Sequence, residues 1–477
     1  MIFSKYCKIF PHGKKSDSFI LFSTKKASSV LISKSVLEDI EKDNLSPEEK
    51  ETLIKLGFLV QDEETEKQEM LNFINELNAA NTKFKAIVVL NLDCNLACKY
   101  CFEGSRKGRF YMTRETADLF IDFVKNNVFS NKEEIKITFY GGEPLLSTDL
   151  IIYISERLKA IVNQRNVNIG TPSPSPLPSR EGQYEKQSPL PRRKRDRVRG
   201  DSRSKEKGII SSISLITNGT LLTPDIVGRL KPLGLKIASV TLDGPKEIHD
   251  QLRPFKSGRG SFDTIVRNVK DVCDMINIHI GGNYTKDNYS EFPSLLDYLM
   301  DNGLTPDRIS SLNFYPVIKE SPEFALPDFT GGCVSINEPW LFDAGIFLRG
   351  EILKRGYKTQ KIMPSPCMME LKDSLVVNYD GGFYKCPGLI GRERFRVGDI
   401  KTGIKDYRQS HNLDNYKNEE CLNCSYLPLC FGGCRYMKLV RDGNINGVDC
   451  KRPYLDATLE RLIYQDVESN PNYKRYL

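Results

Sequence analysis

The sequence lacks any apolar run long enough to cross a bilayer, and residues 1–8 lack the apolar core of a signal peptide. Its 13 cysteines are also too few for a disulfide-rich scaffold in a chain of 477 residues. We therefore expect a protein of the reducing cytoplasm, with no membrane partner, in which free thiolates can hold metal. A chain of this length can form two or three domains with a sizeable core.

Most of the surplus of positive over negative charge lies in one segment. Between Arg180 and Lys207, eleven Lys or Arg residues stand against five Asp or Glu, a surplus of six in a chain whose net charge is +7. A nucleic-acid partner is therefore not expected. The surrounding segment, residues 166–208, is rich in Pro and Arg and has almost no apolar side chains, which predicts a disordered insertion. Its halves 175–180 and 188–193 echo each other, which favours an inserted repeat element over a basic tether for RNA or membrane.

Three cysteines stand directly after the apolar run 86–92, which has the character of a strand. Cys94, Cys98 and Cys101 are separated by three and then by two residues. Thiolates so close together can converge on one metal centre, and three of them leave one coordination position open for chemistry. The alternative is half of a zinc site whose fourth ligand lies elsewhere in the chain.

From residue 84 to about 317, strand-like runs alternate with helical patterns, which predicts parallel strands with right-handed crossovers. The helical patterns are centred near Phe120, Ile154, Val227, Val269 and Leu296. The predicted strands are 86–91, 135–140, 212–217, 237–242, 276–281 and 312–317. The insertion falls after a helix and before a strand. It is therefore expected on the face opposite the carboxyl ends of the strands, and those carboxyl ends are where such folds place their sites.

The cysteine spacing, with the aromatic Tyr100 before the third cysteine, resembles the signature of the radical S-adenosylmethionine (SAM) enzymes. The resemblance implies an α/β fold with a partial (β/α)6 barrel. It also implies a [4Fe-4S] cluster on Cys94, Cys98 and Cys101, whose open iron chelates SAM and cleaves it reductively to a 5′-deoxyadenosyl radical.

Three further strand ends fit the same family. Gly141, Gly142 and Glu143 resemble its contact to the SAM amino group, and the family places the equivalents of Asn218 and Asp243 near the SAM ribose and carboxylate. Together with Tyr100 these are the predicted cofactor-binding residues. In structural terms alone, the Gly-Gly pair and Asn218-Gly219 are compatible with turns, and Asp243-Gly244 with a helix lead-in.

A second group of seven cysteines resembles the SPASM domain, which carries two auxiliary [4Fe-4S] clusters in peptide-modifying enzymes. The resemblance assigns one cluster to Cys367, Cys386 and Cys434, and the other to Cys421, Cys424, Cys430 and Cys450. Seven ligands for eight positions leave one iron open to a substrate thiolate, unless Cys333 or another residue fills it. A zinc ribbon would leave three of these cysteines idle, while Cys7 and Cys273 have the character of ordinary buried thiols.

The remaining segments are predicted as follows. Residues 1–80, with short strands before helical patterns and the capping-box sequence of Ser46 to Glu49, resemble a small α+β winged-helix peptide-recognition module, with a lid or linker arm as the alternative. Residues 84–320 form the radical SAM core, 321–366 a linker, 367–452 the SPASM domain and 453–477 a terminal helix or tail.

The resemblance implies an enzyme that matures a ribosomally made peptide, forming a thioether or other crosslink, as the geopeptide-type maturases do. A precursor peptide and a one-electron reductant, a flavodoxin or ferredoxin, are its implied partners. The rival is the anaerobic sulfatase maturase, which carries an acidic base where this chain has Pro387, although Asp380 or Asp399 could replace it. The alternative of another class is a non-catalytic zinc- or nucleic-acid-binding protein.

Overall fold

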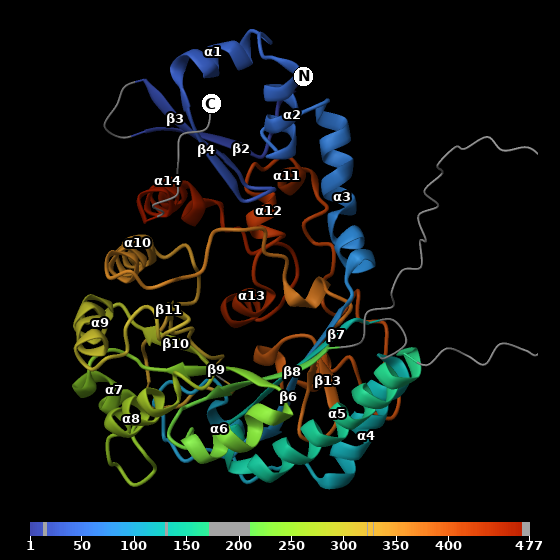
Figure 1. Cartoon of the computed structure of the whole chain (residues 1–477), viewed down its shortest axis with the longest axis vertical. Coiled ribbons are helices and arrows are strands. Elements are labelled where there is room, and N and C mark those ends of the chain that lie inside the picture. The colour runs from blue at the N-terminus through green and yellow to red at the C-terminus, as the bar shows by residue number, and fades with distance from the viewer. Residues whose placement is uncertain (13–16, 129–131, 171–209, 322, 328, 470–477) are drawn as a thin grey trace, which may run out of the picture.

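The computed structural model describes residues 1–12, 17–128, 132–170, 210–321, 323–327 and 329–469 (Figure 1). Almost all of the predicted insertion therefore lies outside the described residues. Its first positions, 166–170, are the last turn of helix α5 (Thr148–Gly170), and the chain resumes at strand β8 (Ile210–Thr217). Within the described ranges, no helix is long and apolar enough to cross a membrane.

The centre of the molecule is a ten-stranded sheet in the order β11-β10-β9-β8-β7-β6-β12-β13-β14-β15. Strands β6 to β11 pair in parallel with their neighbours in chain order, which confirms the six predicted strands and the partial (β/α)6 barrel. Besides β8, these strands are β6 (Lys83–Asn91), β7 (Glu134–Gly141), β9 (Leu235–Thr241), β10 (Asn277–Tyr284) and β11 (Ser311–Pro316).

Helices cover the outer face of these strands, and all of them except α7 stand where the sequence shows a helical pattern (Figure 1). They are α4 (Arg114–Asn127), α5, α6 (Pro224–Leu230), α7 (Lys246–Leu252), α8 (Phe262–Val272) and α9 (Phe292–Asp301). Strand β7 illustrates why the helices pack on this face. Burial alternates along the strand, and Ile135, Ile137 and Phe139 lie in the core shared with α4 and α5. The alternate residues face the inner side, where the site lies.

The N-terminal segment is a separate small module. Strands β2 (Cys7–Pro11), β3 (Ser18–Ser23) and β4 (Ser28–Ser33) form an antiparallel sheet, and β1 (Ile2–Phe3) pairs with β5 (Leu59–Val60). Helices α1 (Lys34–Glu41), α2 (Pro47–Lys55) and α3 (Glu63–Ala80) complete it, and Ser46 and Glu49 cap α2 as a capping box. Figure 1 shows the module at the end of the molecule away from the barrel helices.

The C-terminal segment extends the barrel sheet before it turns to helices. Strand β12 (Ser374–Val377) pairs in parallel with β6, and β13 (Gly382–Tyr384), β14 (Gly398–Asp399) and β15 (Gly403–Ile404) follow as antiparallel neighbours. The helices are α11 (Glu419–Leu422), α12 (Leu427–Cys430), α13 (Arg435–Asp442) and α14 (Arg452–Ser469). The auxiliary cysteines are thus anchored to the barrel itself.

The predicted linker contains a structured element. Within residues 321–366, helix α10 (Pro339–Lys354) packs on α9, β11 and α14 and places Leu341, Ala344, Leu348 and Ile352 in the main core. The helix is apolar on several sides because it lies between the barrel and α14, so it lacks the single apolar stripe by which a surface helix is recognised.

Truncating Phe120 in α4 should lower the free energy of unfolding by about 3–5 kcal/mol, because its fully buried ring fills the space between α4 and the sheet. The matched control is the adjacent Leu119, which is 37% exposed, and Leu119→Ala should change stability by less than about 1 kcal/mol. Urea unfolding followed by circular dichroism measures both. Equal losses for Phe120→Ala and Leu119→Ala would contradict the packing of α4.

Candidate functional site

The three cysteines that follow β6 meet at one cavity. Cys94 and Cys98 are buried and Cys101 is half-buried. All three line a cavity of about 520 Å³, together with Tyr100, Gly141, Gly142, Asn218, Arg253 and Asn283 among others. The cavity therefore lies at the carboxyl ends of the parallel strands, and it collects most of the predicted cofactor contacts.

The Gly-Gly pair lets two strand ends touch. Gly141 has φ +144°, and a Cβ atom added there would lie 2.2 Å from the Asn91 carbonyl oxygen. A Cβ on Gly142 would lie 2.2 Å from the Asp93 carbonyl oxygen. Any other residue would push the loop after β7 away from the cysteine loop after β6. The two glycines therefore let the two loops pack backbone against backbone, and they also line the cavity.

Glu143 links the end of β7 to the end of β8. Its fully buried carboxylate accepts hydrogen bonds from the Thr217 hydroxyl (2.8 Å), the Asn218 backbone N–H (2.7 Å) and the Leu145 backbone N–H (3.0 Å). Burial raises the pKa of Glu143, and these three donors oppose that rise. The carboxylate is thus occupied by protein donors.

Asn218 joins the end of β8 to the cysteine loop. Its side-chain amide donates to Asn95 Oδ1 (2.8 Å) and lies 3.6 Å from Cys94 Sγ. Its Oδ1 accepts from the Thr220 backbone N–H (2.9 Å). The Asn218-Gly219 pair therefore does form a turn, and the same turn aims an amide at the first cysteine.

Tyr100 and Asp243, predicted separately, are hydrogen-bonded to each other. The Tyr100 hydroxyl donates to Asp243 Oδ2 and accepts from Arg253 Nη1 (3.0 Å) and Asn283 Nδ2 (3.2 Å). Asp243 Oδ1 accepts from the Asn283 backbone N–H (2.6 Å). Burial and the Asp243 carboxylate together hold the pKa of Tyr100 well above its ordinary value, so the phenol stays a donor.

A buried histidine, His249, holds Asp243 and Arg253 of this network in position. His249 Nδ1 accepts from the Asp243 backbone N–H (3.1 Å), and Nε2 lies 3.0 Å from the Ser261 hydroxyl, which donates to the Arg253 carbonyl (2.7 Å). Burial and the nearby Arg253 guanidinium lower the pKa of His249 far below its usual value. A neutral imidazole protonated on Nε2 therefore sets the positions of both Asp243 and Arg253.

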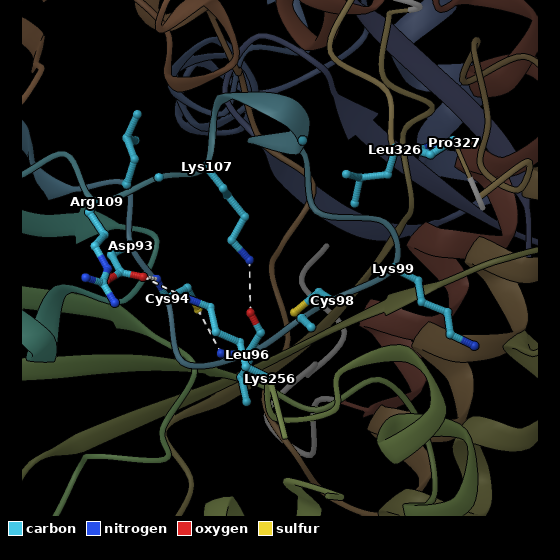
Figure 2. A pocket seen from close by; sticks show the side chains of 14 residues that line it. Asp93, Cys94, Leu96, Cys98, Lys99, Lys107, Arg109, Lys256, Leu326 and Pro327 are labelled. Atoms are coloured by element: carbon cyan, nitrogen blue, oxygen red, sulfur yellow. Dashed lines mark hydrogen bonds and ion pairs between the residues drawn. The ribbon is translucent and has the colours of Figure 1, made fainter. Parts of the chain in front are cut away.

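The cysteine thiols lie in an environment that favours their protonated form until a metal binds. Burial raises the pKa of Cys98 to about 11, against the opposing effect of Arg253 and Lys107. Lys107 donates to the Leu96 carbonyl (3.0 Å), which places its ammonium beside the loop (Figure 2). A metal centre would displace the thiol protons and keep the nearby cations as partners for its charge.

The auxiliary cysteines lie in two neighbourhoods. Cys421, Cys424, Cys430 and Cys450 line one small cavity. Cys367, Cys386 and Cys434 pack around another apolar cluster, and the pKa of the Cys386 thiol is raised by burial and by Cys367 and Cys434. The pKa of Cys333 is raised to about 12 by burial and by Glu338, and its backbone pairs with Val317.

In the described ranges, no three His, Cys, Asp or Glu side chains converge on a position for a single metal ion. A zinc site needs sulfur ligands that all lie about 2.3 Å from one ion. A [4Fe-4S] cluster instead places each thiolate on a different iron, so its ligands stand farther apart around a larger volume. Three cysteines at one cavity supply the kind of donor that such a cluster takes.

The two carboxylates considered as bases do not line this cavity, although Asp380 lines a neighbouring one that shares Phe102 and Glu103 with it. Asp380 Oδ1 accepts from the Gly382 backbone N–H (2.9 Å), and Asp399 Oδ1 accepts from those of Lys401 (2.9 Å) and Thr402 (2.8 Å). The carboxyl group that does line the cavity is Glu103. Burial raises the pKa of Glu103 to about 7, and its Oε2 has no hydrogen-bond partner among the described residues.

Comparisons with known proteins agree with this geometry. A family model described as Radical SAM superfamily matches residues 88–299. Residues 88–299 are a radical SAM domain. The protein is therefore an enzyme whose cofactors are a [4Fe-4S] cluster and SAM, and the alternative of a non-catalytic zinc- or nucleic-acid-binding protein is wrong.

Relatives of this radical SAM enzyme include protein maturases. TigE, a radical SAM cyclopropyl synthase of Paramaledivibacter caminithermalis, is 23% identical over 402 residues, which cover 77% of this chain and 71% of TigE. The cysteine-type anaerobic sulfatase-maturating enzyme of Clostridium novyi is 22% identical over 415 residues, 78% of this chain and 94% of that enzyme. The structure of SuiB from Streptococcus suis bound to precursor peptide SuiA covers 94% of this chain and 98% of SuiB, with a TM-score of 0.52 and 12% identity, and so shares the fold.

Four residues with charged or amide side chains in the radical SAM cavity were not predicted. Arg253, Asn283, Glu103 and Lys107 all line it. Arg253 stands in a segment that resembles the family, and Asn283 lies in the carboxyl-terminal half of β10, so a polar residue near a strand end was an available signal. Glu103 and Lys107 follow the cysteines closely, but the sequence does not show that the chain turns back over the cavity there.

Replacing Tyr100 by Phe should lower the free energy of unfolding by about 2 kcal/mol, because the Asp243 carboxylate loses a donor and Arg253 an acceptor inside the protein. The control is Tyr111→Phe, which removes a hydroxyl bonded to Asp93 on a side chain that is 42% exposed and should cost less than about 0.5 kcal/mol. Urea unfolding of both variants at equal iron content measures the difference, and matching curves would contradict the network.

Proposed function

We propose that this radical SAM enzyme modifies a peptide and forms a thioether or another crosslink in it. One observation carries the proposal: Gly388 and Tyr436, each two residues from a predicted auxiliary ligand (Cys386 and Cys434), line the same cavity as Cys94, Cys98 and Cys101. A substrate in that cavity would contact the first cysteine group and lie beside residues that neighbour the second.

The predicted residues take their roles on that basis. Cys94, Cys98 and Cys101 hold the cluster that, when loaded, supplies the radical by reductive cleavage of SAM. Tyr100 and Asp243, fixed by Arg253 and Asn283, shape one wall of the SAM site, while Gly141, Gly142, Glu143 and Asn218 shape the other. Because these side chains are already bonded to one another, the cavity is organised before the cofactor enters.

The auxiliary cysteines explain why the substrate would carry a thiol. The set of Cys367, Cys386 and Cys434 supplies three ligands. Cys333 is instead fully buried in the main core, where its backbone N–H donates to the Val317 carbonyl (2.8 Å). An open position at that centre, next to the cavity, suits a peptide cysteine thiolate. Joining its sulfur to a peptide carbon removes two hydrogen atoms. The 5′-deoxyadenosyl radical would take the one on carbon, and the thiol hydrogen would leave as a proton and an electron, with the auxiliary cluster as the electron acceptor.

The N-terminal module is the proposed peptide-recognition unit. Its sheet packs on the C-terminal helices, where Phe10, Ile20 and Phe22 share a cluster with Tyr426 and Leu455. The Thr24 hydroxyl donates to the Ser425 carbonyl (2.8 Å) beside Cys424. A peptide held on the module would therefore be delivered next to the cysteine-bearing part of the chain.

Formylglycine formation is the second candidate, because a sulfatase-maturating relative matches along 94% of its own length. Pro387 occupies the position of that family's acidic base, and Asp380 and Asp399 are bound in turns. Mass spectrometry of a peptide encoded beside the gene and coexpressed with the enzyme separates the two. Thioether formation removes two hydrogen atoms and keeps the sulfur, whereas formylglycine formation from cysteine removes the sulfur.

The variant Cys98→Ala should abolish SAM cleavage, because it removes a ligand of the centre that holds SAM. Wild-type protein with three clusters should contain about twelve irons per chain, and Cys98→Ala should lose about four of them. The control is Cys273→Ala, which removes a buried thiol in the barrel and should keep both iron and cleavage. Deoxyadenosine release measures cleavage, and full cleavage by Cys98→Ala would refute the assignment.

The variant Cys424→Ala should leave dithionite-driven SAM cleavage intact while peptide product falls at least about tenfold, because only an auxiliary centre is damaged. Its matched control is Cys7→Ala, a thiol in strand β2 outside both cysteine sets. Deoxyadenosine and modified peptide are quantified in the same reaction. If cleavage and product fall together, Cys424 does not belong to a separate auxiliary centre.

A further inference from the structure

The cysteine loop has a second, outer side. A cavity of about 490 Å³ lies there, and Figure 2 shows the side chains that line it. Cys94, Cys98 and Lys107 line both this outer cavity and the inner one. The two cavities therefore adjoin at the cysteine loop, and the exposed residues Lys99, Arg109 and Lys256 line only the outer one.

The outer side is strongly basic. Lys99, Lys107, Arg109 and Lys256 line it, and Asp93 is the one acidic residue in its described lining. Asp93 is already bonded to Lys256 (2.8 Å) and to the Tyr111 hydroxyl (2.6 Å), so it leaves the other cations uncompensated. Outside the segment 180–207 the chain carries a net charge of only about +1. The concentration of cations here is a local feature.

The loop and its neighbour form one continuous surface. The turn 252–260 is hydrogen-bonded to the cysteine loop through Ala97 N to Pro254 O (2.8 Å) and Lys256 N to Asn95 O (3.0 Å). It adds the exposed Arg259, stacked on Phe255 at 4.7 Å. Phe110, 48% exposed, contributes apolar area beside Arg109. We call the surface of Lys99, Arg109, Lys256 and Arg259 around the loop the basic face.

We infer that the basic face is the docking surface for a small acidic electron-carrier protein with a flavin or an iron–sulfur centre. The inference rests on the proposed function, because each SAM cleavage consumes one electron. The reduced carrier supplies that electron and leaves oxidised by one electron, while the C5′–S bond of SAM breaks. SAM and peptide would fill the inner cavity, so the electron would enter from the outer cavity.

The physical character of the surface suits this partner. Electron-transfer encounters are small and short-lived, and opposite charges raise their association rates at low salt. Exposed Lys99, Arg109 and Lys256 supply such charges around the loop that carries Cys94 and Cys98. An acidic peptide or a nucleic acid would also be attracted by charge, but neither gains from lying against the cysteines.

The test compares two double charge reversals in the cluster-loaded protein. Lys99→Glu/Arg109→Glu alters the basic face without touching Lys107 or the Asp93–Lys256 pair. Arg267→Glu/Lys270→Glu is the matched control, because both residues are exposed on α8 on the outside of the barrel. Both variants change the net charge equally.

The first readout is binding, which does not depend on turnover. Calorimetric titration with oxidised flavodoxin at low salt should show about tenfold weaker affinity for Lys99→Glu/Arg109→Glu and wild-type affinity for the control. Added salt should lower the flavodoxin affinity of the wild type and of the control until both approach that of Lys99→Glu/Arg109→Glu. Carbodiimide coupling should join carrier carboxylates to Lys99 or Lys256 in the wild type.

The second readout is deoxyadenosine release without peptide. With reduced flavodoxin the basic-face variant should be about tenfold slower than the control, and with dithionite the two should be equal. Equal rates with flavodoxin, equal losses with both reductants, or unchanged flavodoxin affinity would overturn the inference. A defect seen only when peptide is present would assign the face to the peptide and also overturn it. Failure of the wild type to cleave SAM with dithionite would instead refute the proposed function.

Discussion

The contact between the ends of β6 and β7 supports the rest of the site. Gly142 N donates to Asn91 O (3.0 Å) and Glu143 N to Asp93 O (2.8 Å), so backbone hydrogen bonds join the loop that carries the three cysteines to its neighbour. The Asn91 side chain adds bonds to the Glu143 carbonyl (3.1 Å) and the Ser147 hydroxyl (2.8 Å). Glu143 extends the connection to β8 through Thr217 and Asn218. Three adjacent strand ends thus form one rigid rim, as preorganised binding of a reactive cofactor requires.

A second set of contacts ties the C-terminal cysteines to the same rim. Strand β12 lies beside β6, and the buried Glu370 and Arg435 form an ion pair that joins the residues after Cys367 to the residue after Cys434. Glu320 accepts from the Tyr436 hydroxyl (2.6 Å) and from Arg392 (2.7 Å) at the edge of the cavity. Buried ion pairs contribute little net stability, but removing one partner is costly, so such pairs fix geometry.

The sequence predicted the barrel well because each of its elements has a local signal. The six strands are apolar runs, and polar residues mark their carboxyl ends at Glu143, Asn218 and Asp243. Contacts between distant segments had no such signal: the bond from Tyr100 to Asp243 spans 143 positions, and β12 joins the sheet across most of the chain. Helix α10 was also missed, because a helix buried on several sides lacks amphipathic periodicity.

The N-terminal module shares buried surface with the C-terminal helices. It has a core of its own, which includes Leu21, Ile32 and Phe58. Beyond that core, Tyr6 and Met70 share a cluster with Leu422 and Phe431, and Cys421 packs against the same cluster. Segments far apart in the sequence therefore close together around one of the auxiliary cysteines, so a change in the packing of the module would also be felt at Cys421.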